Sequence, residues 1–409
     1  MRPSLRHAFL AGLFAASPAC ADWSGRVGLE YLYFWNEPED KAQHMQYGSA
    51  FIEPKFNREW DDGKQQFNFT GFARLDPRDD ERQHADIREL EYLKVGESHE
   101  LRVGIRKVFW GVTEAQHLVD IVNQSDIVEN PDGDTKLGQP MLNVAFIHDV
   151  GTLDLFVMPY FRERTFPGKE GRPRFRFVVD EGLASYEAGS EERHLDFAAR
   201  WSMSTSGLDL GLSYFYGTSR LPRLIPTPIA PGQIVLAPRY DLIHQFGLDA
   251  TYVDDAWLWK LEVINREHIE TWHLALSAGF EYTFSGVRDS AVDVGLLAEY
   301  LYDDRGEDAS TIDLIPPIQA VAPPSAFQND LFVGMRIGFN DVQSSQILAG
   351  LAYDLDGRGL TYSVKAERRL GETWKLNLEW RGYAGAPPDD VLHALRNEDS
   401  ARVTLAWYF

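Results

Sequence analysis

Residues 272–284, WHLALSAGFEYTF, decide the fold class. Apolar side chains stand at every second position, and the residues between them are small or polar. A period of two places the two kinds of side chain on opposite faces of a β-strand, whereas a helix repeats near 3.6 residues. At 13 residues, the run exceeds the five or six residues that are usual for a strand in a soluble protein. It is therefore predicted to be a long strand with one apolar and one polar face.

The same alternation recurs along the chain, for example over 292–303 and 402–409. We find 18 such segments between Ser24 and Phe409, and helical spacing of apolar residues is scarce. Most of the segments run for about 10 to 14 residues, and a tilted strand needs about 9 to 11 residues to cross a membrane. The mature chain is therefore predicted to be all-β, with strands long enough to span a bilayer.

The predicted connections alternate between short and mostly long. The short ones are 61–63, 97–99, 149–151, 205–207, 254–255, 286–289, 340–343 and 371–372, and the long ones are 36–46, 112–138, 164–191, 219–238, 304–328 and 385–398. This asymmetry is typical of outer-membrane barrels. We expect an antiparallel transmembrane β-barrel of about 18 strands, with 16 as the nearest alternative. Short turns would face the periplasm, and long loops would be extracellular.

Aromatic residues support this prediction, because they gather near the ends of predicted strands. Rings are stable at the boundary of lipid and water, where barrels carry aromatic girdles. A soluble β-sandwich or propeller is the alternative, and it explains neither the girdles nor the loop asymmetry. The positions that we assign to the girdles are Tyr31, Tyr33, Trp35, Trp110, Tyr214, Tyr216, Trp257, Trp259, Trp374, Trp380, Trp407 and Tyr408.

The composition excludes several other classes of protein. The formal net charge is −22, which argues against a nucleic-acid partner. The mean hydropathy of −0.32 excludes a bundle of transmembrane helices, and a single cysteine excludes a disulfide scaffold. In an alternating strand the apolar and polar faces cancel in the average, so the polar mean is compatible with a barrel.

Residues 1–21 resemble a secretory signal peptide. Arg2 and Arg6 precede the apolar stretch 8–16, and Ala19-Cys20-Ala21 forms a small-x-small cleavage site. A lipoprotein acylated at Cys20 is the alternative, although Ser17 stands where a leucine is normally expected. We expect residues 22–409 to form one transmembrane barrel domain. The first predicted strand starts so near Ala21 that a plug domain is not expected before it.

Two segments carry a resemblance to known proteins. The ending AWYF at 406–409 resembles the C-terminal signal of outer-membrane barrels, which implies recognition of Trp407, Tyr408 and Phe409 by the barrel-assembly machinery. Residues 88–163 are similar to a segment of an uncharacterised family of proteobacterial outer-membrane proteins with the pattern LRxGRQxxxWG followed by DxxNPxD. The matching residues are Gly104, Arg106, Trp110, Gly111, Asp120, Asn123 and Asp126.

This resemblance has limits. Ile105 separates the glycine from the arginine that follows it directly in the family, and Gln124 replaces a common proline. The rest of the chain resembles alginate-export-type porins only broadly. The resemblance therefore implies the fold more than the function.

The strand register predicts which charged side chains line the lumen. Acidic and basic residues are nearly balanced there, so they can pair across strands or form a polar track for a solute. Arg102 and Arg106 flank Gly104 beside the long loop 112–138, and we expect them at a constriction because guanidinium groups bind carboxylates and phosphates in a fork. The other predicted pore-lining residues are Arg74, Lys365, Arg369, Arg381, Glu367 and Glu379.

The loop 112–138 is too apolar for a freely solvated segment. It mixes residues such as Val119 and Ile121 with Asp120, Asn123 and Asp126. Folding into the lumen explains this composition, and so does packing against a neighbouring subunit. We favour the lumen and take the three polar residues as constriction candidates. A calcium site at residues 132–134 is not expected, because the spacing falls short of an EF-hand loop.

No motif for catalysis or for metal binding stands out. The chain has no G-x-S-x-G elbow and no H-E-x-x-H, so we expect neither an enzyme nor a metal or cofactor. Barrel enzymes that assemble their site across strands remain an alternative. The expected function is passive passage of small polar or anionic solutes, or export of a polysaccharide, across the outer membrane of a Gram-negative bacterium. A closed structural or partner-binding barrel is the alternative from another class. The expected partners are outer-membrane lipid, lipopolysaccharide, the assembly machinery and the transported solute.

Overall fold

The computed structural model describes residues 22–269, 271–306, 323, 325–357, 359–388 and 390–409, so the predicted signal peptide lies outside the described residues. Within these ranges, 18 antiparallel strands form one sheet. The strands are β1 (Asp22–Phe34), β2 (Gln46–Trp60), β3 (Gln65–Leu75), β4 (Ala85–Val95), β5 (His99–Arg106), β6 (Gln139–His148), β7 (Gly151–Met158), β9 (Asp196–Thr205), β10 (Leu208–Thr218), β13 (Leu242–Asp254), β14 (Trp257–His268), β15 (Thr271–Phe284), β16 (Asp293–Asp303), β17 (Asn329–Gly338), β18 (Gln346–Asp354), β19 (Leu360–Leu370), β20 (Trp374–Ala384) and β21 (Ser400–Tyr408).

The sheet closes on itself as a barrel. Each strand pairs with the strand before and after it in this series, and β1 also pairs with β21, with Leu29 opposite Leu405. Closure leaves no open sheet edge in the wall, so the backbone hydrogen bonds of every strand are satisfied by its neighbours. The prediction of 18 strands, rather than 16, is confirmed.

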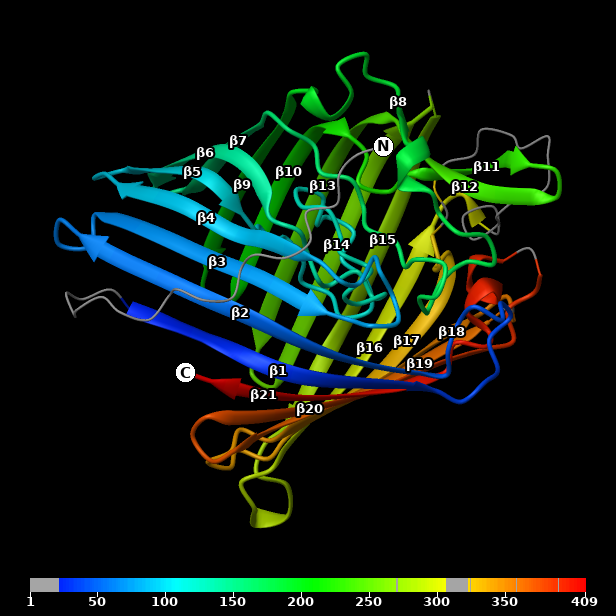
Figure 1. The fold of residues 1–409 in the computed structure, drawn as a ribbon. Helices are drawn as coiled ribbons and strands as arrows, with labels where there is room; N and C mark the ends of the chain where they lie inside the picture. The colour runs from blue at the N-terminus through cyan, green and yellow to red at the C-terminus, as the bar shows by residue number, and fades with distance from the viewer. Residues whose placement is uncertain (1–21, 270, 307–322, 324, 358, 389) are drawn as a thin grey trace, which may run out of the picture.

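The two ends of the barrel differ, as the loop lengths predict. Short turns join β2 to β3, β4 to β5, β6 to β7 and the later pairs at one end, where the C-terminus also lies (Figure 1). The long connections begin and end at the other end of the barrel. Two connections at the long-loop end are short, namely 269–270 between β14 and β15 and 355–359 between β18 and β19.

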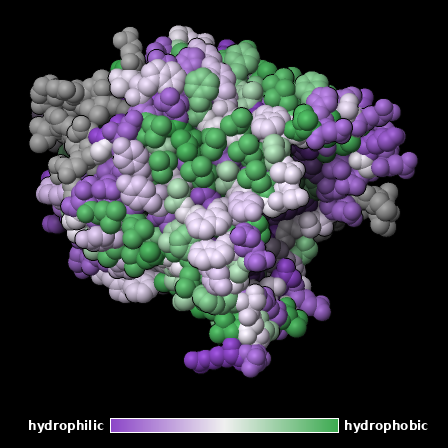
Figure 2. All heavy atoms as spheres, turned by 180° about the vertical axis from the view of Figure 1, so that it is seen from behind, coloured by the Kyte–Doolittle hydropathy of each residue, from purple (hydrophilic) through white to green (hydrophobic). Residues whose placement is uncertain are grey.

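The outer face of the wall is apolar. In β15, Trp272 and Leu274 point outward with 44% and 37% of their surface exposed, whereas His273 and Ser277 point inward and are buried. Figure 2 shows hydrophobic and aromatic side chains gathered over one face of the wall, with hydrophilic side chains toward its edges. The period-two pattern therefore has a lipid-facing side, as expected for a membrane barrel. Among the described residues, no helix is long and apolar enough to cross a membrane.

The loop segment 219–238 differs from the prediction. It contains β11 (Arg223–Ala230) and β12 (Gln233–Tyr240), which pair as a hairpin, and β12 pairs in parallel with the short β8 (Ser185–Tyr186). Because of Pro226 and Pro228, this segment was predicted to be a loop. They are tolerated because β11 is an edge strand of the small sheet, where fewer backbone donors are needed. Short 3-10 helices cover η1 (Glu181–Leu183), η2 (Glu191–Arg193), η3 (Val287–Asp289) and η5 (Val391–Leu395).

Candidate functional site

The connection between β5 and β6, residues 107–138, is called the inner loop below. It winds inside the barrel (Figure 1) rather than projecting from the rim. Its Val119, Ile121 and Val122 are almost fully buried, and they pack in one apolar cluster against the inner wall. The wall contributes Met141, Phe156, Met158, Ala198, Phe215, Ile243, Ile264 and Ala275, from β6 to β15. Burial of each large apolar side chain stabilises the packed loop by roughly 1.5–3 kcal/mol.

Trp110 belongs to this cluster and not to an aromatic girdle. Its ring is 5% exposed, lies 5.6 Å from the ring of Phe156, and is covered by the guanidinium group of Arg200 at 5.4 Å. The girdle assignment of Trp110 was therefore wrong. The segment after Arg106 leaves the wall and turns inward, so strand alternation no longer applies to it.

Two wall carboxylates hold the first half of the inner loop by its backbone. Glu262 on β14 is fully buried and accepts hydrogen bonds from the amides of Val112, Thr113 and Val119 at 2.7, 3.0 and 3.1 Å. Glu299 on β16 accepts from the amides of residues 114 and 115. Amide donors that are buried in the lumen are thereby satisfied by charged acceptors, which form the stronger kind of hydrogen bond.

The opposite wall holds the loop through arginines. Arg74 on β3 reaches Glu129 at 2.6 Å, and Arg88 on β4 reaches Asp126 at 2.6 Å. All four side chains are nearly inaccessible to solvent. Breaking one partner of a buried pair of this kind costs about 3–5 kcal/mol, because it leaves an uncompensated charge. The inner loop is therefore fixed at β3–β4 as well as at β14–β16, and so it crosses the lumen.

The tip of the inner loop makes a third attachment. Asp132 lies 3.1 Å from Lys365 on β19 and 3.0 Å from Arg381 on β20, and Asp134 lies 3.3 Å from Lys365. Burial opposes ionisation of Asp132, but Arg381 and Lys365 hold the pKa of this carboxyl below its usual range. Burial and the neighbouring Asp132 raise the pKa of Asp134. The tip is thus anchored by two cations from adjacent strands.

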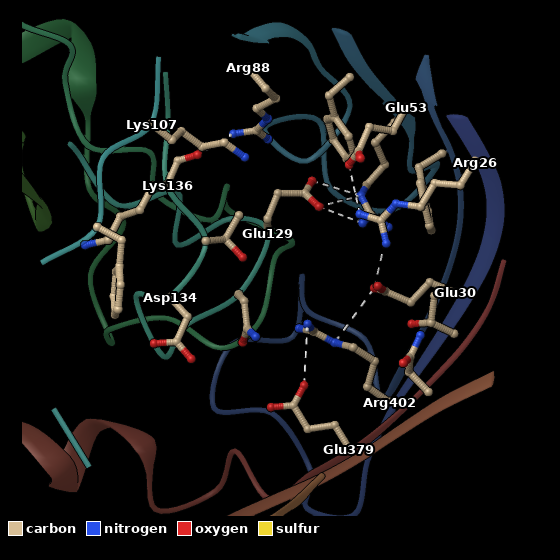
Figure 3. A pocket seen from close by; sticks show the side chains of 18 of the residues that line it. Arg26, Glu30, Glu53, Arg88, Lys107, Glu129, Asp134, Lys136, Glu379 and Arg402 are labelled. Atoms are coloured by element: carbon tan, nitrogen blue, oxygen red, sulfur yellow. Dashed lines mark hydrogen bonds and ion pairs between the residues drawn. The ribbon is translucent and has the colours of Figure 1, made fainter. Parts of the chain in front are cut away.

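Three cavities surround the inner loop. The largest of the three, of about 600 Å³, lies between the loop and the wall formed by β1 to β4, β20 and β21. Figure 3 shows Lys107, Glu129, Asp134 and Lys136 of the loop facing a cluster of wall side chains across it. The labelled wall residues are Arg26, Glu30, Glu53, Arg88, Glu379 and Arg402.

The two other cavities hold about 270 and 280 Å³. The 270 Å³ cavity lies between the loop and β14–β16, and the 280 Å³ cavity lies beside β17–β20. Asp134 lines all three cavities, and Asn130, Asp132 and Lys136 each line two of them. The three spaces therefore meet at loop residues 130–136.

The structure places Arg102 and Arg106 on the inner wall of β5, away from the residues that line these cavities. Arg102 pairs with Glu100 at 2.6 Å. Arg106 lies 2.9 Å from Glu91 and donates a hydrogen bond of 2.6 Å to Asn143. Both guanidinium groups are thus engaged by wall side chains. Loop residues 130–136, and not Arg102 and Arg106, occupy the position beside the cavities.

The other predicted pore-lining residues divide into two groups. Arg74, Arg381 and Lys365 contact the inner loop as described above, and Glu379 pairs with Arg381 at 2.5 Å. Glu367 pairs with Lys375 at 2.7 Å and lines the 280 Å³ cavity. Arg369 is exposed near the short-turn end of β19 and is not among the residues that line the three cavities.

The three predicted constriction residues of the loop have different surroundings. Asp120 lines the 270 Å³ cavity and lies 3.0 Å from Lys136. Asn123 is buried beside the same cavity and donates to the carbonyls of Arg106, the last residue of β5, and of Leu137 at 2.9 Å. Asp126 is fully buried on Arg88 and lines none of the three cavities. Two of the three thus hold the loop in place.

Sequence reasoning missed Arg88. The alternation places Glu89 and Glu91 inward, and it would turn Arg88 toward lipid. Thr70 pairs with Glu89 and the next residue, Gly71, pairs with Ile87, so Arg88 is the extra residue of a bulge in β4 and also faces inward. A bulge inserts one extra residue and changes which side chains face the lumen. Gly71 is the one local signal for it.

The remaining predicted sites concern metals and the C-terminus. Within the described ranges, no group of three or more His, Cys, Asp or Glu side chains is placed to hold a metal ion. Trp407 and Tyr408 end β21 with rings that are about 40% exposed, and Phe409 exchanges two backbone hydrogen bonds of 3.1 Å with Gly25. These residues close the barrel at its short-turn end.

No family model and no curated protein sequence matches the chain. Solved structures share its fold. OccK3 of Pseudomonas aeruginosa has a TM-score of 0.53 and 11% identity, covering 95% of this chain and 96% of that chain. Wzi, an outer-membrane protein of Escherichia coli involved in group 1 capsule assembly and described as a carbohydrate-binding β-barrel, has a TM-score of 0.52 and 8% identity, covering 94% of this chain and 84% of that chain. The chain is therefore similar in fold to outer-membrane β-barrels, and the family resemblance of residues 88–163 stays a prediction.

Proposed function

We propose that this protein is a passive channel of the outer membrane for small polar solutes, with a preference for anions. The observation that carries the proposal is the inner loop, which crosses the lumen and is fixed to opposite walls. We expect a loop held in this way to narrow the barrel without closing it, and we take the cavities around residues 130–136 as the path. Their volumes suit solutes of small-molecule size.

The charges along this path support the preference for anions. Twelve Lys and Arg residues line the three cavities together, against nine Asp and Glu residues, although the whole chain has a net charge of −22. The excess negative charge therefore lies elsewhere. A narrow space lined by an excess of cations raises the local concentration of anions. We propose diffusion rather than catalysis, because the charged groups of the path serve mainly to hold the inner loop.

Single-channel recording in a planar bilayer tests this function. The full-length mature protein, folded in detergent, should give steady current steps, and a salt gradient should give a reversal potential of the sign for anion preference. Absence of current from a folded barrel would overturn the channel and favour the alternative, a closed barrel that binds a partner. Current with cation preference would overturn the preference for anions but not the channel.

A further inference from the structure

The connection between β7 and β9 lies at the long-loop end of the barrel, and its residues 162–180 are called the strap below. Near β7 the strap contacts the inner loop, where the Thr165 hydroxyl donates to Asp126 at 2.7 Å. Further along, the Gly168 amide donates to Asp79 in the connection between β3 and β4 at 3.1 Å. The strap therefore runs from β7 over the inner loop toward the first strands of the barrel.

Arg172 fastens the far end of the strap. Its side chain is fully buried, lies 2.8 Å from Glu398 in the connection between β20 and β21, and lies over the ring of Phe34 at 4.1 Å. At 3.2, 3.3 and 2.7 Å it also donates to the backbone carbonyls of Asn36, His44 and Asn397. One guanidinium group thus joins the strap to two connections of the rim, and these contacts of Arg172 are called the latch.

From the latch, the strap continues to the opposite side of the mouth. Arg174 lies 2.8 Å from Asp40 beside the latch, and four residues later the Val178 carbonyl accepts from the Leu236 amide in β12 at 2.8 Å. Four residues span at most about 14 Å. The β11–β12 hairpin, at the long-loop end (Figure 1), joins β10 to β13, the ninth and tenth of the 18 strands around the barrel, whereas β1 and β2 are the first and second. The strap and the hairpin together therefore bridge nearly opposite walls.

A buried layer lies between the strap and the 600 Å³ cavity. Phe166 of the strap and Asp79 and Arg82 of the connection between β3 and β4 are all buried. Arg82 donates to the carbonyl of Val128 in the inner loop at 3.1 Å and pairs with Glu30 on β1 at 2.5 Å. All residues of the strap are described, and none of them lines this cavity. The layer therefore separates the 600 Å³ cavity from the long-loop end on the side of β1 to β4.

The strap is held by contacts that can be released without disturbing the wall. Each hydrogen bond that joins residues 168–174 to other parts of the described chain has a side chain as one partner, such as the bond of 2.8 Å from Gln43 to the Gly171 carbonyl. A cavity of about 680 Å³, lined in part by Arg174 and Glu398, borders the latch and leaves room for movement. Segments with few contacts open locally at a much lower free energy than the whole fold. The latch can therefore open while the strands of the barrel stay paired.

We propose that the strap is a lid of the channel. With the latch closed, the lid covers the mouth on the side of β1 to β4, and solutes reach the 600 Å³ cavity past the tip of the inner loop. With the latch open, the lid lifts from the connection between β3 and β4, and this cavity gains a wider and more direct opening. The inference rests on the proposed function, because a lid controls passage only through a barrel that conducts.

Labelling of a cysteine beneath the lid tests its closure. Residues 22–409 contain no cysteine, so Ser49→Cys provides a single thiol. Ser49 is buried and lies two residues from Tyr47, whose hydroxyl donates to the Glu170 carbonyl of the strap. In detergent, a polymer-linked maleimide should react with this thiol at least tenfold faster when Arg172→Gln is also present, because the buried carboxylate opposite Arg172 then loses its counter-charge.

Two further variants and a current measurement complete the test. Glu398→Gln keeps an oxygen that can accept from Arg172, so the labelling rate should rise less. Arg176→Gln is the matched control, because this exposed arginine of the strap contacts the ring of the adjacent Phe177 and pairs with no carboxylate of the described residues. In planar bilayers, Arg172→Gln should add openings of at least twofold larger conductance than the wild type, and Arg176→Gln should not.

The outcomes separate the lid from the channel itself. An equal labelling rate with and without Arg172→Gln, or an equal rise with Arg176→Gln, would overturn the lid. Faster labelling without larger openings would place the strap off the solute path and would overturn its role in the channel. Variants are compared only where their unheated and heated electrophoretic mobilities differ as in the wild type, which shows a folded barrel. Absence of current from every variant would overturn the proposed function, and labelling alone would then decide whether the strap opens.

Discussion

At the scale of single residues, the lumen is organised by charges that each have a structural task. Glu262 is fully buried and accepts four hydrogen bonds from the inner loop, three from amides and one of 2.7 Å from the Thr113 hydroxyl. Such a carboxylate is tolerated away from water because its lone pairs are used. The same group thereby determines where the inner loop lies.

Replacing Glu262 by alanine should release the first half of the inner loop. Each donor left without an acceptor costs about 1–3 kcal/mol, so the loop should exchange between attached and detached states while the barrel stays closed. Trypsin should then cleave after Lys107 or Lys136 at least tenfold faster, and single-channel conductance should rise. Glu262→Gln keeps one acceptor oxygen and should have a smaller effect. Cleavage of the alanine variant at the wild-type rate would contradict this role.

Glu181, on η1 in the long connection between β7 and β9, predicts a dependence on pH. Burial, with Glu81 and Glu163 nearby, raises the pKa of its carboxyl from 4.5 to about 7, although the Phe166 amide donates to it at 2.9 Å. When the connection between β7 and β9 is ordered, the carboxyl of Glu181 therefore keeps its proton at pH values where it would release it in the detached connection. The resulting stability is full below pH 4.5, falls as the pH rises, and is lost above about pH 7. Each unit of the shift corresponds to about 1.36 kcal/mol.

Hydrogen exchange at the Phe166 amide measures this effect. After correction for the intrinsic rate, protection should be at least tenfold higher at pH 5 than at pH 8. Glu181→Gln is neutral at both values and keeps an acceptor for Phe166, so its protection should not change between them. A dependence on pH that persists in the glutamine variant would assign the effect to another group.

At the scale of elements, the inner loop shows what sequence can and cannot predict. Its apolar residues predicted that it is buried, since Val119 and Ile121 have no place in a solvated loop. The strands that receive it could not be predicted, because the contacts join residues far apart in the sequence, more than 100 positions for those with β14 and β19. The alternation of β15 was predictable, since it depends on neighbours in the sequence. The bulge at Arg88 in β4 was not predictable, because one extra residue changes the face without changing the composition.

The tip of the inner loop predicts ion selectivity. The double variant Lys365→Gln and Arg381→Gln removes both cations that hold Asp132, and it leaves the carboxylates of Asp132 and Asp134 beside the path. The reversal potential in a potassium chloride gradient should shift toward cation preference, and the conductance should rise as the tip becomes mobile.

The control for the tip variant has the same change in charge. Lys64→Gln with Lys94→Gln removes two exposed lysines near the turns that flank β3 and β4, outside the residues that line the cavities. Their loss should leave the reversal potential within error of the wild type. Equal shifts in the two double variants would mean that only the total charge of the protein matters, and not the tip.

At the scale of the whole molecule, the first and last strands must meet for the barrel to exist. The pairing of β1 with β21 covers Arg26 to Phe34, and the two hydrogen bonds between Gly25 and Phe409 extend it by one step. An unpaired strand edge in lipid would leave several polar groups without partners, at several kcal/mol each. The last residues therefore have a structural task in closure, apart from any task as an assembly signal.

Phe409→Ala separates these two tasks. The substitution keeps both backbone hydrogen bonds with Gly25 and removes only a ring that is 46% exposed and packs 5.3 Å from the ring of Trp407. Refolding in detergent should therefore proceed as in the wild type, with a loss of about 1 kcal/mol or less from the missing contact. If the ring is read during assembly, the amount of folded barrel in the outer membrane of living cells should fall several-fold. Wild-type amounts in cells would show that closure alone explains the aromatic ending. A parallel loss in detergent would show instead that the ring stabilises the barrel itself.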